Sequence, residues 1–170
     1  MTPCPECGLD PTTMGPGDAV AALRSFPRRW RGAFALTGDD DDGRELLSRH
    51  PDDGGPSALD RAGLVRAGLD RWDERIRQAL TQERPTLTAE EPGGATPPDA
   101  GAAVEGLSAS AETLAGTLGG VASGDWDRRA DLGGQEVTVL AMAQSAAHDG
   151  AHHLRAVERL LRDLKGRSAT

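Results

Sequence analysis

Three of the four histidines lie close together near the C-terminus, as His148, His152 and His153. The first two are four residues apart, so on a helix their imidazoles project from one face about one turn apart. An imidazole pair at this spacing can ligate one metal ion. Two polar residues on a solvated helix face are the plainer interpretation, but such crowding is unusual in a chain whose only other histidine is His50. The spacing therefore favours a metal site on this helix.

The only two cysteines form a second half-site, in the run Cys4-Pro5-Glu6-Cys7-Gly8. This spacing, followed by glycine, is typical of the knuckle that wraps two thiolates around one zinc ion. No second cysteine pair exists, so any further ligands must be histidines or carboxylates from elsewhere in the chain. We therefore predict one Cys2His2 site, formed by Cys4, Cys7, His148 and His152, and thiolate ligands favour zinc over nickel or iron.

Two other interpretations of the cysteines stay open at this point. A segment at a chain terminus is often an irregular tail with no ligand. A redox pair of the thioredoxin type has the same spacing, but that motif lies between a strand and a helix, and the prolines and glycines of residues 1–17 predict neither.

Length and charge narrow the class of protein. A chain of 170 residues is most often one domain with its own core. The net charge of −8 disfavours nucleic acid as a partner, because phosphate binding needs a basic face. The sequence predicts no membrane span and no secretion signal, so we expect a cytoplasmic protein. A homodimer is one assembly compatible with this composition.

Amphipathic patterns predict the first two helices. The first is expected from Asp18, as its cap, to about Leu36, with Pro27 kinking or interrupting it. The second begins at Ser57, and Asp60 three residues later completes a capping box. Its apolar residues recur at intervals of three and four, so we assign its tryptophan, Trp72, to the core.

Two further helices follow after a broken, polar stretch. Residues 84–95 are predicted to be an exposed connection, although their length would also allow a lid over a site. The third helix is expected to start with Thr96 as cap and to end at Gly119-Gly120, and the last to span residues 138–165. Residues 135–137 could be briefly extended between them. Residues 37–56 form a loop with a short helical turn at 44–49.

These patterns predict an all-α fold. Aromatic residues make up only 3% of the chain and there is no tyrosine, so leucine, valine and alanine must form the core, which suits packed helices better than a sheet. We predict a four-helix bundle over residues 18–166, preceded by an irregular metal-binding segment at residues 1–17.

Three pieces of sequence resemble a known superfamily. They are Pro56-Ser57-Ala58-Leu59-Asp60, Gly124-Asp125-Trp126, and the stretch from Glu136-Val137-Thr138-Val139-Leu140 to His148-Asp149-Gly150-Ala151-His152-His153-Leu154. Their order and spacing over residues 18–165 resemble the DinB-like bundles, which include proteins of the mycothiol-dependent maleylpyruvate isomerase and bacillithiol transferase types. The resemblance implies an up-down-down-up bundle with a divalent metal at its open end, bound by one histidine of the second helix and an HxxxH pair of the last.

The pair carries over to His148 and His152, with His153 replacing one of them if the alignment shifts by one residue. The histidine of the second helix does not carry over. Its position falls near Gly63 or Leu64, and this chain has no histidine there. The three-histidine site of the family is therefore absent, and the two cysteines are its candidate replacement.

Two classes of function follow from this difference. With an open position, the metal could serve a transferase, isomerase or hydrolase acting on a small electrophile with a low-molecular-weight thiol or water. Asp149, Glu6 and His153 are then candidates to move protons, and the sequence does not select among them. With four protein ligands, the metal would instead be structural, in a non-catalytic binding module or one that responds to metal or redox conditions.

Overall fold

The computed structural model describes residues 3–38, 40–90 and 93–168 of the chain, and most of them are helical. The helices and strands, in chain order, are η1 (Pro11–Thr13), α1 (Pro16–Phe34), α2 (Asp41–Ser48), α3 (Ala58–Thr81), β1 (Thr86–Leu87), α4 (Ala100–Gly119), β2 (Arg129–Leu132), β3 (Gln135–Thr138) and α5 (Val139–Ser168). None of the helices described is both long and apolar enough to cross a membrane.

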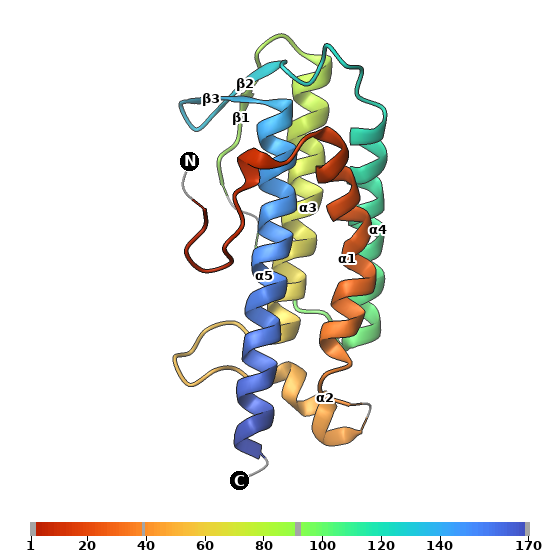
Figure 1. Ribbon diagram of the computed structural model, residues 1–170, viewed down its shortest axis with the longest axis vertical. Coiled ribbons are helices and arrows are strands. Elements are labelled where there is room, and N and C mark those ends of the chain that lie inside the picture. The colour runs from red at the N-terminus through yellow and green to blue at the C-terminus, as the bar shows by residue number, and fades with distance from the viewer. Residues whose placement is uncertain (1–2, 39, 91–92, 169–170) are drawn as a thin grey trace.

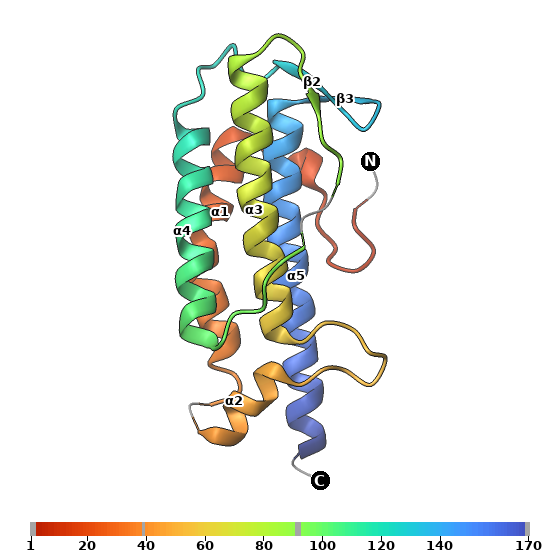
Figure 2. The ribbon, with the colours of Figure 1, turned by 180° about the vertical axis from the view of Figure 1, so that it is seen from behind.

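Four long helices form the bundle. α1 and α3 each pack against both α4 and α5, so the four surround one core (Figure 1). α1 and α5 run in one direction, and α3 and α4 run in the other, with a long connection returning from the end of α3 to the start of α4 (Figure 2). This is the up-down-down-up arrangement that the resemblance implied, and the predicted fold class is confirmed.

The core contains few aromatic residues, as the composition predicted. Phe26 and Trp30 of α1 are fully buried, and four alanines of α5, Ala143, Ala146, Ala147 and Ala151, are buried as well. Gly150 of α5 lies against Phe26 so closely that a Cβ there would be 2.2 Å from the Phe26 ring. Small residues on α5 thus let the large side chains of α1 approach its backbone.

Several helix ends differ from the sequence prediction. α1 begins at Pro16, because Gly15 is the cap and Asp18 lies at the third helical position, where its side chain accepts the Gly15 N–H. Pro27 does not interrupt α1. The cap of α4 is Asp99, not Thr96, because the Asp99 carboxylate accepts the N–H of Ala102 at 2.8 Å.

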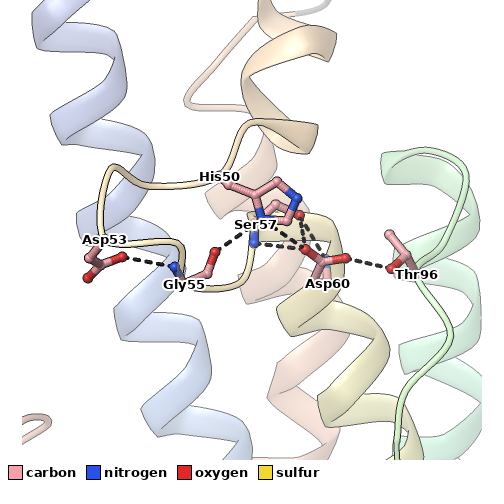
Figure 3. A network of polar contacts seen from close by, with 6 residues as sticks. All are labelled: His50, Asp53, Gly55, Ser57, Asp60 and Thr96. Carbon is pink, nitrogen blue, oxygen red and sulfur yellow. Dashed lines mark hydrogen bonds and ion pairs between the residues drawn. The ribbon is translucent and has the colours of Figure 1, made fainter.

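The predicted cap of α3 is present, and it ties three segments together (Figure 3). Ser57 and Asp60 form the capping box, with the Ser57 N–H donating to Asp60 Oδ2 at 2.9 Å. Thr96 donates its hydroxyl to the other oxygen of Asp60, and His50 Nδ1 lies 3.6 Å from Asp60 Oδ2 and 3.1 Å from Gly55 O. The Thr96 hydrogen bond, with those from Ser57, lowers the pKa of Asp60.

A small sheet lies at one end of the bundle, which the sequence prediction did not include. β2 and β3 pair antiparallel across a Gly133-Gly134 turn in which both glycines have positive φ, and β1 adds to β2 in parallel. β3 covers the stretch that the sequence allowed to be extended, and it leads directly into α5. The sheet therefore fixes where α5 begins (Figure 1).

Candidate metal centre

The N-terminal segment folds as a turn against α5 (Figures 1 and 2). Within the turn, the Gly8 N–H donates to Cys4 O at 2.7 Å, and the Cys4 N–H donates to Leu9 O at 2.9 Å. Gly8 has φ +69°, a left-handed conformation that favours glycine. Arg159 of α5 donates to Glu6 O at 2.9 Å and so holds the turn on the helix. The cysteine spacing therefore forms a knuckle, as predicted, and this knuckle faces α5.

All four residues predicted to bind metal lie together. Cys4 Sγ is 3.6 Å from His152 Nδ1, and Cys7 Sγ is 3.4 Å from His148 Nε2. One donor atom from each of the four lies within 4.8 Å of every other. Tetrahedral zinc with Zn–S of about 2.3 Å and Zn–N of about 2.0–2.1 Å has sulfur–nitrogen edges of about 3.5 Å. The two measured separations match such edges, so the residues fit the ion that their chemistry favours.

Each imidazole has a carboxylate beside its second nitrogen. His148 Nδ1 is 3.4 Å from Asp149 Oδ1, and His152 Nε2 is 3.3 Å from Glu6 Oε2. The indole N–H of Trp72 donates to the other oxygen of Asp149 at 3.0 Å. A carboxylate at one ring nitrogen favours the proton there and leaves the lone pair of the other nitrogen free for a metal. In both histidines, that free nitrogen is the one facing a cysteine.

The two thiols have different environments. The backbone N–H of Cys7, the imidazole of His148 and the backbone N–H of Glu6 lower the pKa of Cys4 to about 6. Burial raises the pKa of Cys7, whose side chain is only 2% exposed, whereas Cys4 is half-buried. Cys4 is therefore mainly a thiolate at neutral pH even without a metal, and it is the more accessible of the pair.

The resemblance places a third histidine near Gly63 or Leu64 of α3, and the structure differs at these two positions. Leu64 lines a cavity beside α5, whereas Gly63 is buried under the connection between α3 and α4. A Cβ at Gly63 would lie 2.3 Å from Ala95 O, and a Cβ at Gly94 would lie 2.3 Å from the Gly63 carbonyl carbon. Two backbones thus meet at Gly63, and no side chain fits there. The described part of the connection is mostly exposed, as predicted, although Pro85 and Leu87 are buried and Gly94 packs on α3.

His153, the alternative ligand, points elsewhere. It lies outside the four-residue cluster and lines a cavity between α3 and α5. Burial lowers the pKa of His153, and the nearby charge of Arg61 lowers it further. Its Nδ1 is buried and has no hydrogen-bond partner among the described residues.

Sequence reasoning missed one residue near the site. Trp72 belongs to the apolar stripe of α3 and was assigned to the core, where most of its side chain indeed lies at 8% exposure. Its N–H nevertheless reaches Asp149, 77 residues away in the sequence. Nothing in the helical spacing of α3 indicates this contact.

Comparison with known proteins supports the fold. No family model and no curated protein matches the sequence. Among solved structures, the chain is similar to YfiT from Bacillus subtilis, with a TM-score of 0.73 over 88% of this chain and 87% of that chain, at 15% sequence identity. YfiT is described as a probable metal-dependent hydrolase with an unusual four-helix bundle topology. At this identity the likeness shows the fold alone, and it supports the predicted four-helix bundle.

Proposed function

We propose that Cys4, Cys7, His148 and His152 bind one zinc ion, and that the ion holds the N-terminal segment on α5 as a closed structural site. The observation that carries this proposal is the pair of sulfur–nitrogen separations, 3.6 and 3.4 Å, which are close to the sulfur–nitrogen edges of a zinc tetrahedron, within a cluster of four donor atoms that lie within 4.8 Å of one another. The protein is, on this view, a zinc-binding bundle whose metal is part of its fold.

Charge and donor type support zinc. Two thiolates balance the two positive charges of the ion, so the complete site is neutral and tolerates partial burial. Sulfur donors disfavour magnesium and calcium, which prefer oxygen. The carboxylates of Glu6 and Asp149 lie beside the second nitrogens of the two histidines, where carboxylates orient histidine ligands in zinc proteins.

The ligand count supports a structural role. Four protein donors complete a tetrahedron, whereas catalytic zinc usually keeps a position for water. At Gly63, one of the two positions where the resemblance would place a third histidine, the backbone contact leaves no room for a side chain. The irregular segment before α1 contributes few buried side chains of its own, so metal binding would supply much of the free energy that holds it.

A metal-dependent enzyme is the second candidate, because Cys4 is half-buried and accessible whereas Cys7 is not. If Cys4 left the metal, the open position would let bound zinc activate water or a low-molecular-weight thiol for hydrolysis, transfer or isomerisation of a small electrophile. In that case Cys7, His148 and His152 would hold the ion and Glu6 would keep His152 oriented. The description of YfiT as a probable hydrolase agrees with this candidate.

Metal content distinguishes the candidates. We would measure zinc by mass spectrometry in the wild type, in Cys4→Ser, in Cys7→Ser and in His152→Ala, with His50→Ala as a matched control outside the cluster. The structural proposal predicts about one zinc per chain in the wild type and control, and loss in all three cluster variants. Loss in Cys7→Ser and His152→Ala with zinc retained in Cys4→Ser would favour the enzyme. Zinc retained in both cysteine variants would remove the thiols from the site.

A further inference from the structure

A cavity of about 340 Å³ opens between α3 and α5, next to the metal centre but outside its cluster of donor atoms. α3 gives it an apolar wall that includes Leu64, Val65 and Leu69. α5 faces this wall with Ala146 and the backbone of Gly150, and such small residues leave the space unfilled. Cavities of this size and lining accept small organic molecules.

One charged group lines the cavity. Asp149 is the anion, with its side chain half exposed, and Trp72 and His153 are the other polar residues of the wall. Neither lysine nor arginine occurs among the described residues that line it. Arg75 lies over the Trp72 ring at 4.8 Å, but it donates its N–H groups to the carbonyl of Thr88. The cavity is therefore an apolar space with an acidic edge.

We propose that this cavity binds a small organic amine, with its apolar body against α3 and its ammonium paired with Asp149. A carboxylate can accept about four hydrogen bonds, and Trp72 and His148 account for one contact each. An ammonium supplies donors for the remaining lone pairs and balances the charge. A carboxylate ligand would instead meet Asp149 as a like charge in a partly desolvated space. The inference goes beyond the zinc site and does not depend on its role.

A glycine in the cavity wall allows a selective block. Gly68 of α3 lines the cavity, and a Cβ built there has no atom within 4 Å. Gly68→Leu should therefore fill the space without disturbing the helix. Gly116→Leu on α4 is the matched control, because its Cβ also has nothing within 4 Å and it lies on an exposed face away from this cavity.

The test is calorimetric titration of the zinc-loaded full chain with three probes of similar size: 2-phenylethylamine, 2-phenylethanol and phenylacetate. We expect the amine to bind with a Kd of about 1 mM or below, as its atom count allows, and the alcohol and the acid to bind at least tenfold more weakly. Gly68→Leu, checked for folding by circular dichroism, should lose amine binding at least tenfold, and Gly116→Leu should keep it.

Two results would overturn the proposal. Equal or tighter binding of phenylacetate would show that the acidic edge does not select the ligand, and this result needs only the wild type. Unchanged amine binding in folded Gly68→Leu would place the amine somewhere else. The proposal would also be overturned if the wild type showed no detectable binding at an amine concentration of about 10 mM, which is tenfold above the expected Kd.

Discussion

Replacing Gly63 by alanine tests whether the connection before α4 packs on α3 as closely as the structure shows. A Cβ at Gly63 would lie 2.3 Å from Ala95 O and 3.0 Å from the Ala95 carbonyl carbon. Both atoms belong to the backbone, so no side-chain rotation relieves the contact. The connection must move away from α3, and the nearby Thr96–Asp60 hydrogen bond would be strained with it.

The expected difference in free energy of unfolding follows from comparison with Gly68, five residues further along the same helix. Alanine is favoured over glycine in a helix interior by about 1 kcal/mol, and Gly68→Ala should gain that much because its Cβ has open space. Gly63→Ala has the same intrinsic gain but an overpacking cost of about 1–3 kcal/mol, with about 1 kcal/mol more for the weakened hydrogen bond. The two variants should therefore differ in free energy of unfolding by about 2–4 kcal/mol.

The assay is urea unfolding of the zinc-loaded proteins, followed by circular dichroism, with thermal unfolding as a second measurement. For a chain of this size, the difference corresponds to about 4–16 °C in Tm, at about 2–4 °C per kcal/mol. If Gly63→Ala proved as stable as Gly68→Ala, the connection would not be packed on α3.

Three further changes have defined outcomes. Asp149→Asn removes the carboxylate beside His148 and should weaken zinc binding about 10- to 100-fold, measured by competition with a chelator. Asp60→Asn should cost about 1 kcal/mol at pH 7. The folded-state pKa of Asp60 is lowered, so the Asp60 carboxylate stabilises the fold fully above its unfolded-state pKa of about 4. This stabilisation is lost as the pH falls through the folded-state pKa. The unfolding curves of the wild type and Asp60→Asn should therefore converge at acidic pH. Arg75→Met leaves the carbonyl of Thr88 without its buried donor and should lower the free energy of unfolding by about 2–3 kcal/mol.

Each of these has a contrary result. Unchanged chelator competition in Asp149→Asn would mean that the carboxylate does not orient His148. A constant stability difference between wild type and Asp60→Asn at every pH would assign the effect of Asp60 to packing. Wild-type stability in Arg75→Met would show that the hydrogen bonds to Thr88 do not stabilise the connection, which the pairing of β1 with β2 and the Gly94–Gly63 contact also hold.

The clustering of Cys4, Cys7, His148 and His152 was predictable because each half of the cluster is a local pattern. The cysteine spacing and the glycine after it define a knuckle, and the helical spacing of His148 and His152 defines a ligand pair. Because the chain has no other cysteines, the cysteine pair and the histidine pair have few other partners with which to complete a four-ligand site. The bundle was predictable for a similar reason, since each long helix carries its own apolar stripe.

What could not be predicted depends on contacts between segments distant in sequence. Thr96 is a good capping residue by type, yet it bonds to Asp60 and leaves the cap to Asp99. The contact of Trp72 with Asp149 and the packing of Gly94 on Gly63 arise only once α3 has neighbours. β1 pairs with β2 across the chain, and its two residues carry no alternation of their own. The hairpin of β2 and β3 across Gly133-Gly134 is local, and sequence reasoning missed it.

The most direct test of the central claim is X-ray absorption spectroscopy at the zinc edge of the purified, zinc-loaded protein. A closed Cys2His2 site predicts two sulfur neighbours at about 2.3 Å and two imidazole nitrogens at about 2.0 Å, with no water in the first shell. A shell of nitrogen and oxygen alone would contradict the account, because it would leave the cysteines free. One sulfur, two imidazoles and an exchangeable water would contradict the closed site and favour the enzyme.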